Sequence, residues 1–146
     1  MKAQNRYDSL FRYYGYVFGV DWCLLKAQAL VESGLNPKAK SSKGALGLAQ
    51  FMPSTWIEWG EGDILCAEDS IKAQARYMKW LLDQFKDSDE AVKWALASYN
   101  WGIGNVKKIY SPDKKFSDIW EKLPSETQRY VAKVFYYRAK IRRGLI

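Results

Sequence analysis

One segment constrains the fold more than any other: SIKAQARYMKWLLDQF, residues 70–85, in which apolar side chains recur at helical spacing. The recurring positions are Ile71, Ala75, Met78, Leu82 and Phe85. Apolar residues three or four positions apart share one face of an α-helix, so the segment predicts an amphipathic helix that packs against a core. Patterns that alternate apolar and polar residues are scarce elsewhere. The sequence therefore predicts a mainly α fold.

Further helices are expected on the N-terminal side of this segment. We expect the first at roughly residues 4–16 and the second at residues 21–34, with Gly34 as its stop. Residues 36–52 are rich in Gly, Pro and Ser, which indicates a loop or a small irregular, β-like flap. A short helical turn is expected from Leu46, and Ser54 is expected to cap a helix through Trp59.

Two more helices are expected towards the C-terminus. Asp87 or Ser88 is expected to cap the first, which ends in the segment NWGIGN, residues 100–105. Ser125 and Gln128 have the spacing of a capping box for the last helix, which should run to about residue 143. With 146 residues, the chain has the size of one compact domain, residues 1–146.

Composition excludes several classes of protein. No run of about 18 uncharged apolar residues occurs, so no stable membrane insertion is expected. The N-terminal residues lack the pattern of a signal peptide. Cys23 and Cys66 lie far apart, and two cysteines are few for a secreted disulfide scaffold, so both are expected to be reduced, with a single bridge between them as the alternative. The formal net charge of +7 favours an anionic partner, such as nucleic acid, a membrane surface or an acidic wall polymer.

Histidine is absent from the chain. This excludes Ser-His-Asp and Cys-His nucleophile systems and zinc sites that contain histidine, and two distant cysteines cannot make a zinc site. No metal and no cofactor is therefore expected. In an enzyme of this composition, carboxylates, Lys, Tyr or Cys must move the protons.

Glu32 is an isolated acid, because no other Asp or Glu occurs before Glu58. We expect it in the last turn of the helix at residues 21–34, where the helix dipole disfavours an anion. Leucine and valine neighbours favour burial, which also raises the pKa of a carboxyl group and keeps it protonated for use as an acid. Lys26 or Lys38, folded onto Glu32, would cancel this effect.

Three segments then point to a known family. ESGLNPKAKSSKGALGLAQFMPSTW, residues 32–56, resembles the first signature of the soluble lytic transglycosylase family, whose fold is lysozyme-like. ASYNWGIGNV, residues 97–106, and ETQRYV, residues 126–131, are similar to the second and third family elements. Residues 68–85 resemble the helix that the family places between the first two. The elements follow the family's order over roughly residues 20–140.

The resemblance implies a reaction on the glycan strands of peptidoglycan. Glu32 would act as an acid on the bond between N-acetylmuramic acid and N-acetylglucosamine, and then as a base on the muramoyl C6 hydroxyl. That oxygen attacks C1 internally and gives a 1,6-anhydro end without using water. A single carboxyl group thus replaces the pair that most glycosidases need.

The resemblance also implies a set of substrate-binding residues: Ser41, Gln50, Met52, Tyr99, Asn100, Trp101 and Tyr130. Ser41 would bond the Glu32 carboxyl or the substrate's N-acetyl group. Trp101 departs from the family's usual Ala, and its ring would narrow a sugar subsite or add a stacking surface. Tyr99 is equally compatible with a core tyrosine whose hydroxyl is satisfied. Four glycines would let the backbone approach the sugar closely: Gly44, Gly47, Gly102 and Gly104.

The expected biological setting rests on features that the sequence lacks, whereas the expected chemistry rests on motifs that it contains. The small size and the absence of a signal peptide suggest a monomeric, phage-type endolysin, made in the host cytoplasm and released to the cell wall. The alternatives are a goose-type muramidase that uses Glu58, Asp63 or Glu126 to activate water, and a non-catalytic wall-binding or cationic membrane-perturbing protein. Nucleic acid is not an expected partner, because the basic residues are scattered and no recognition motif occurs.

Overall fold

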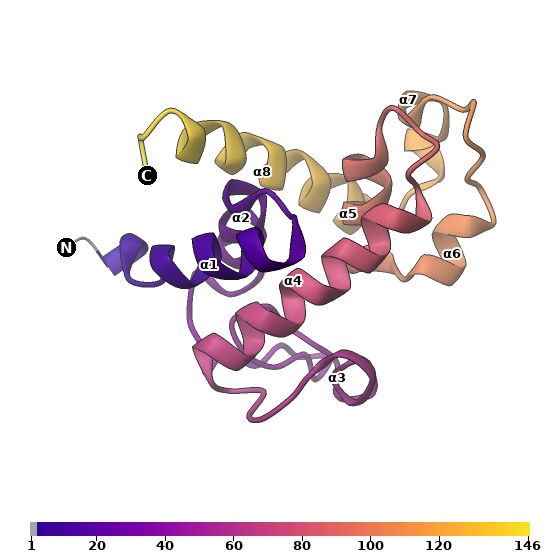
Figure 1. Ribbon diagram of the computed structural model, residues 1–146. Coiled ribbons are helices and arrows are strands. Elements are labelled where there is room, and N and C mark those ends of the chain that lie inside the picture. Colours follow the sequence, from indigo (N-terminus) through magenta and orange to yellow (C-terminus); the bar gives the residue numbers. More distant parts are fainter. Residues whose placement is uncertain (1–2) are drawn as a thin grey trace. The chain divides into compact units, whose positions relative to one another are not determined.

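The computed structural model describes residues 3–146, and they are mainly helical, as the apolar periodicity predicts (Figure 1). The elements in chain order are η1 Ala3–Asn5, α1 Asp8–Phe18, α2 Trp22–Ser33, α3 Pro53–Trp59, α4 Ala67–Gln84, α5 Ala91–Trp101, α6 Ile103–Lys107, α7 Phe116–Ile119, η2 Trp120–Lys122 and α8 Ser125–Arg142. Two compact units are formed, the first by residues up to Tyr77 with Val134–Ile146, the second by Met78–Lys133. The prediction of one domain over residues 1–146 stays a prediction.

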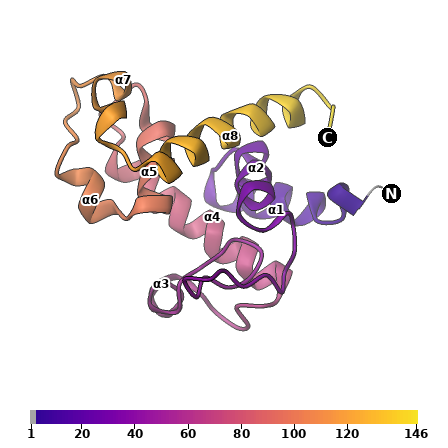
Figure 2. The same ribbon diagram turned by 180° about the vertical axis from the view of Figure 1, so that it is seen from behind.

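In the first unit, α1 and α2 pack against each other, and Figures 1 and 2 show them side by side. Phe11 of α1 and Leu25 of α2 are fully buried, as is Ile71 of α4. Two buried amides join α2 to α4, because the Gln74 side chain donates to the Leu25 carbonyl and to Gln28 Oε1. These contacts fix the helix that carries Glu32.

The second unit is built around the buried ring of Trp94 in α5. It packs edge-on against Tyr110 and Phe116, with ring centroids 4.9 and 5.1 Å away. Glu90, just before α5, accepts from the Phe116 backbone N–H at 2.6 Å and from Lys93 Nζ at 3.1 Å. These bonds hold the pKa of Glu90 below its ordinary value.

Several predicted boundaries are confirmed and others are wrong. Gly34 ends α2 with a left-handed φ of 64°. The first helix is η1 followed by α1, and α1 runs past residue 16 to Phe18. Residues 47–50 form turns and not a helix. Ser54 does not cap α3: the helix begins at Pro53 with Met52 before it, because proline suits the first helical position.

The C-terminal caps also differ from the prediction. No side-chain cap precedes α5, and the Ser88 hydroxyl instead accepts from the Glu90 backbone N–H. Ser125 is the first residue of α8, and the Gln128 amide nitrogen donates to the Trp120 carbonyl at 2.7 Å, so the capping box at Ser125 stays a prediction. The short elements α6, α7 and η2 were not predicted. They are too short to show a period of their own.

Candidate active site

Glu32 lies in the last turn of α2, as predicted, and is partly buried. Asp21 caps the other end of this helix by accepting from the Cys23 backbone N–H. Gly34 then turns the chain away, its N–H bonding to the carbonyls of Ala29 and Leu30. The carboxyl group is thus held at the carbonyl end of a rigid helix, where the helix dipole disfavours a negative charge.

Lys26, one of the two lysines expected as possible partners of Glu32, is engaged elsewhere. Its side chain is fully buried, and its Nζ lies 2.7 Å from Asp8 Oδ1 and 3.1 Å from Asn5 Oδ1. The contact with Asp8 is an ion pair without hydrogen-bond alignment, because Oδ1 has no partner that meets hydrogen-bond geometry. The charge of Lys26 is thus neutralised by α1.

The loop after α2 folds back on itself as the flap that the sequence predicts. Isolated antiparallel bridges join Lys40 to Leu46 and Leu46 to Phe51. Within the flap, Ser41 is bonded twice to Ala45: its N–H donates to the Ala45 carbonyl, and its Oγ accepts from the Ala45 N–H. The hydroxyl oxygen of Ser41 therefore shapes the flap, and its proton remains a donor.

Two serines, the partly buried Ser33 and the fully buried Ser70, hold residues 48–49 of the flap. Ser33 Oγ donates to the Leu48 carbonyl at 2.7 Å, and Ser70 Oγ accepts from the Ala49 N–H at 3.1 Å. Gly47 lies beside them at a φ of 85°, and a Cβ there would clash with the Ile64 carbonyl. Gly47 is thus required for the close approach of the chain's own backbone.

Gln50 and Met52 follow these residues in the same flap. Gln50 has a left-handed φ of 55°, which is uncommon for a residue other than glycine. Its amide nitrogen donates to the carbonyls of Ala39 and Gly47 at 3.2 and 2.9 Å. The side-chain donor is therefore used within the flap, and Oε1 is the group that Gln50 can offer to a ligand. Met52 is 42% exposed.

The other predicted site residues lie in the second unit. Tyr99, Asn100 and Trp101 are consecutive in the last turn of α5, and each is partly buried. Asn100 Oδ1 accepts from the hydroxyl of Thr127, a buried residue of α8, at 2.8 Å. Because this bond occupies the amide oxygen, Asn100 offers its amide nitrogen as donor.

Tyr130 and Trp101 differ in exposure. Tyr130 is 5% exposed in α8 and so is a core residue over most of its surface. Trp101 is partly buried at the end of α5, and its carbonyl accepts from Asn105 Nδ2. Gly102 has a φ of 97°, whereas Gly104 lies inside α6. Gly104 therefore lacks the positive φ that Gly102 has, and no special backbone conformation supports the expected role of Gly104.

The structure thus groups the predicted residues in two sets, each within its unit. Glu32, Ser41, Gln50 and Met52 belong to the end of α2 and the flap. The second set is Tyr99, Asn100, Trp101 and Tyr130. Three residues that position them were not predicted from the sequence: Ser33, Ser70 and Thr127. Ser33 and Thr127 stand inside the family motifs, and that was the only available signal.

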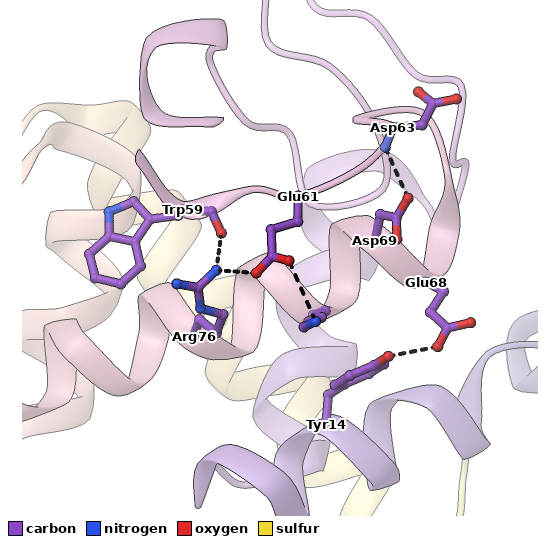
Figure 3. Close-up of polar contacts among 8 residues, drawn as sticks. Tyr14, Trp59, Glu61, Asp63, Glu68, Asp69 and Arg76 are labelled. Atoms are coloured by element: carbon purple, nitrogen blue, oxygen red, sulfur yellow. Dashed lines mark hydrogen bonds and ion pairs between the residues drawn. The ribbon is translucent and has the colours of Figure 1, made fainter. Parts of the chain in front are cut away.

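The remaining acids near the flap make structural contacts (Figure 3). Glu61 pairs with Arg76 at 3.2 Å, and Asp69 accepts from the Asp63 backbone N–H at 2.9 Å. Glu68 accepts from the Tyr14 hydroxyl at 2.6 Å, which raises the pKa of Tyr14 to about 12. These bonds hold the loop before α4 in place.

Residues 3–146 contain neither a cluster of side chains suited to a metal ion nor a membrane-spanning helix. No group of three or more His, Cys, Asp or Glu side chains lies close enough together to hold a metal ion in that part of the chain. Over the same residues, no helix is long and apolar enough to cross a membrane. Cys23 and Cys66 are both free, as the sequence predicts.

Comparison with known proteins agrees with the predicted family. Residues 9–121 match the profile of the transglycosylase SLT domain. The chain is 40% identical over 90 residues to membrane-bound lytic murein transglycosylase F of Pasteurella multocida, covering 60% of this chain and 18% of that protein. It is 34% identical over 146 residues to the protein of the same name from Aeromonas hydrophila, covering 92% and 29%.

A solved structure has the same fold. The 70-kDa soluble lytic transglycosylase of Escherichia coli matches with a TM-score of 0.83 at 29% identity, covering 97% of this chain and 25% of that one. The complex of the 70-kDa soluble lytic transglycosylase with bulgecin A matches at 0.84 and 28%, with the same coverage. The chain therefore spans less than a third of the length of these relatives.

Proposed function

Because the chain belongs to the transglycosylase SLT domain family, we propose that it is a peptidoglycan lytic transglycosylase. It cleaves the bond between N-acetylmuramic acid and N-acetylglucosamine and leaves 1,6-anhydro ends. The observation that carries the proposal is the family match over residues 9–121, which includes Glu32 at the acidic position of the first motif. The names and the fold of the relatives support the same activity.

Glu32 performs both proton transfers in this proposal. Its protonated carboxyl group gives a proton to the glycosidic oxygen while the bond from C1 to that oxygen breaks. The resulting carboxylate then takes the proton of the C6 hydroxyl while that oxygen bonds to C1. The carboxyl group ends as it began, and no water is consumed. Holding the hydroxyl close to C1 gives the rate advantage of an intramolecular step.

Features of the first unit support this role for Glu32. The first transfer needs a carboxyl group that keeps its proton, and the carbonyl end of a helix and partial burial both favour the neutral form. Asp8 neutralises Lys26, the nearest lysine before Glu32 in α2. The Ser41 hydroxyl has a proton to donate, and Gln50 offers an acceptor, so the flap supplies polar groups for a sugar.

The second unit supports the proposal through Asn100. The Thr127 hydroxyl occupies the amide oxygen of Asn100, so the amide nitrogen is directed to other partners. Sugar hydroxyls and the carbonyl of an N-acetyl group accept hydrogen bonds from such a donor. Trp101, next in the chain, supplies an aromatic face of the kind on which sugars stack.

The hydrolytic alternative needs a second acid that activates water. Its three candidates, Glu58, Asp63 and Glu126, are all exposed. One of them, Asp63, already accepts from the Leu65 backbone N–H at 2.8 Å. Exposure leaves a carboxylate solvated, so no observation favours a base at these positions.

The test is digestion of purified peptidoglycan followed by mass spectrometry of the fragments. The parent should release 1,6-anhydro ends. Glu32→Gln should release none, and Glu58→Gln, which alters an exposed acid of the same unit, should act like the parent. Fragments heavier by one water would identify a hydrolase. Full activity of Glu32→Gln would refute the role of this carboxyl group.

We further propose that the site of action is the bacterial envelope, because a net charge of +7 suits an anionic surface. A role in host-cell lysis, as in a phage-type endolysin, rests on the sequence expectation alone. It is tested by producing the chain inside bacteria and permeabilising the inner membrane. Lysis that needs both permeabilisation and Glu32 would support the role.

A further inference from the structure

One peptide unit of the flap, the one that joins Leu48 to Ala49, is held at both ends by side chains from two helices. Ser33 Oγ, at the end of α2, donates to the Leu48 carbonyl at 2.7 Å. Ser70 Oγ, near the start of α4, accepts from the Ala49 backbone N–H at 3.1 Å. We call Ser33 and Ser70 the two-serine clamp, because together they fix both polar groups of this peptide.

The clamped peptide is the centre of a turn that ends at Gln50. The Gln50 backbone N–H donates to the Gly47 carbonyl at 3.2 Å, and the Gln50 side-chain nitrogen donates to the same carbonyl at 2.9 Å. In a turn of this kind the central peptide can rotate while the two ends stay bonded, and turn types I and II differ in this way. The clamp therefore selects one orientation of the peptide that leads into Gln50.

The residues on either side of the clamped peptide have left-handed backbone conformations. Gly47 has a φ of 85° and Gln50 has a φ of 55°. For a residue with a Cβ, this conformation is strained, and it persists only where the surrounding contacts impose it. The two bonds of the clamp are contacts of this kind, because they fix the peptide next to Gln50.

The clamp stands on a rigid and dry base. Leu48, Ala49 and Ser70 are fully buried, so water does not readily replace a bond that is lost there. The two helices that carry the serines are also joined to each other, since the Gln74 amide of α4 donates to the Leu25 carbonyl of α2. Each serine thus holds the peptide from a fixed position.

Ser33 links this turn to the proposed catalytic acid, because it follows Glu32 in the chain. Its hydroxyl lies 3.2 Å from the Ala29 carbonyl within α2 and 2.7 Å from the Leu48 carbonyl in the flap. The shorter contact is the stronger hydrogen bond, so the single proton is directed to the flap. The turn that carries Gln50 is therefore bonded directly to the neighbour of Glu32.

We propose that Ser33 and Ser70 are positioning residues for the cleavage reaction. They hold the peptide between Leu48 and Ala49 in one orientation, and they thereby fix the position of Gln50 relative to Glu32. This role rests on the proposed function and deepens it, because it says how the site is kept ready before a glycan arrives. Neither serine needs to contact the substrate.

The first test measures kcat and KM on soluble glycan strands. Ser33→Ala and Ser70→Ala should each lower kcat about tenfold, because a misplacement of about 1 Å can cost about a hundredfold. KM should change by less than about twofold, since the other groups that bind the glycan stay in place. Ser33→Thr keeps the hydroxyl and should have a kcat within about twofold of the parent.

The double variant separates one shared role from two independent roles. Both bonds orient the same peptide, so the loss of either one releases it. Ser33→Ala/Ser70→Ala should therefore lose about tenfold in kcat, whereas two independent effects would multiply to about a hundredfold.

A third serine supplies the matched control. Ser88, a buried residue of the second unit, accepts from the Glu90 backbone N–H at 3.1 Å, which is also the length of the bond between Ser70 and Ala49. Ser88→Ala loses an equivalent bond outside the flap and should keep the kcat of the parent. Circular dichroism and thermal unfolding identify an assay temperature at which every variant is folded.

Amide hydrogen exchange tests the clamp without a substrate. The backbone amides of Ala49 and Gln50 should exchange at least about tenfold faster in both single alanine variants than in the parent, and Ser88→Ala should leave them unchanged. Because this measurement needs no glycan, it remains decisive if the parent releases hydrolytic fragments. Failure of the clamp and failure of the proposed reaction are thus told apart.

Four results would overturn the proposal. The first is a kcat of Ser33→Ala or Ser70→Ala equal to that of Ser88→Ala. The second is a multiplicative loss in the double variant. The third is a fall in kcat while the exchange of the Ala49 and Gln50 amides stays unchanged, since the serines would then act by another route. The fourth is a kcat of Ser33→Thr as low as that of Ser33→Ala, since the hydroxyl would then not be the cause.

Discussion

Asp8 and Lys26 form a pair whose two members should respond very differently to substitution. Lys26 is fully buried and Asp8 is 23% exposed, while Nζ and Oδ1 are 2.7 Å apart. At this distance, with an effective dielectric constant of about 20, the attraction is about 6 kcal/mol. Desolvation offsets a large part, so removing the anion from the buried ammonium should cost about 3 kcal/mol.

Asp8→Asn should therefore destabilise the protein by about 3 kcal/mol, because it leaves a buried cation with only neutral acceptors. Lys26→Met should cost about 1 kcal/mol, because methionine fills a similar volume and the Asp8 carboxylate, 23% exposed although its Oδ1 is buried, keeps part of its hydration. The double variant should be about as stable as Lys26→Met alone. Urea denaturation, followed by tryptophan fluorescence, gives these free energies of unfolding.

Comparison of Asp8→Asn with Lys26→Met checks the same reasoning. The two single variants separate the electrostatic contribution of the pair from the packing of the lysine stem. If Lys26→Met proves as costly as Asp8→Asn, packing of the lysine stem dominates, and the electrostatic explanation is wrong.

Three further predictions concern the flap and the second unit. Gly47→Ala should destabilise the protein by about 3 kcal/mol, because its Cβ would clash with the Ile64 carbonyl. Gly44→Ala should cost only about 1 kcal/mol, because its φ is positive but a Cβ there meets no other atom. Thermal unfolding of the two variants compares these costs. Glu90 stabilises the fold above its ordinary pKa of about 4.5, and this is lost as pH falls through its lowered folded value, so Glu90→Gln should flatten the acid side of the stability curve. Thr127→Val should lower kcat on glycan strands about tenfold with little change in stability, because valine has no donor for Asn100. Thr127→Ser keeps that donor and should have the kcat of the parent. Equal kcat values in both variants would rule out this orienting role.

Local signals in the sequence determined the helices and the position of the acid. The apolar period of residues 70–85 became α4, and Gly34 ended α2 in the conformation that glycine adopts readily. The sequence alone therefore places Glu32 in the last turn of its helix. These features depend on neighbours within a few residues, and that is why the sequence is sufficient for them.

Tertiary contacts decided which partner each polar group takes. The Gln128 amide nitrogen donates to the Trp120 carbonyl, and Lys26 pairs with Asp8. Gly47 is needed because the Ile64 carbonyl lies against it. A local pattern shows that a donor or a small residue is present, but its partner comes from a segment brought near by folding. Only the folded chain fixes that distance, and the free energy of each contact depends on it.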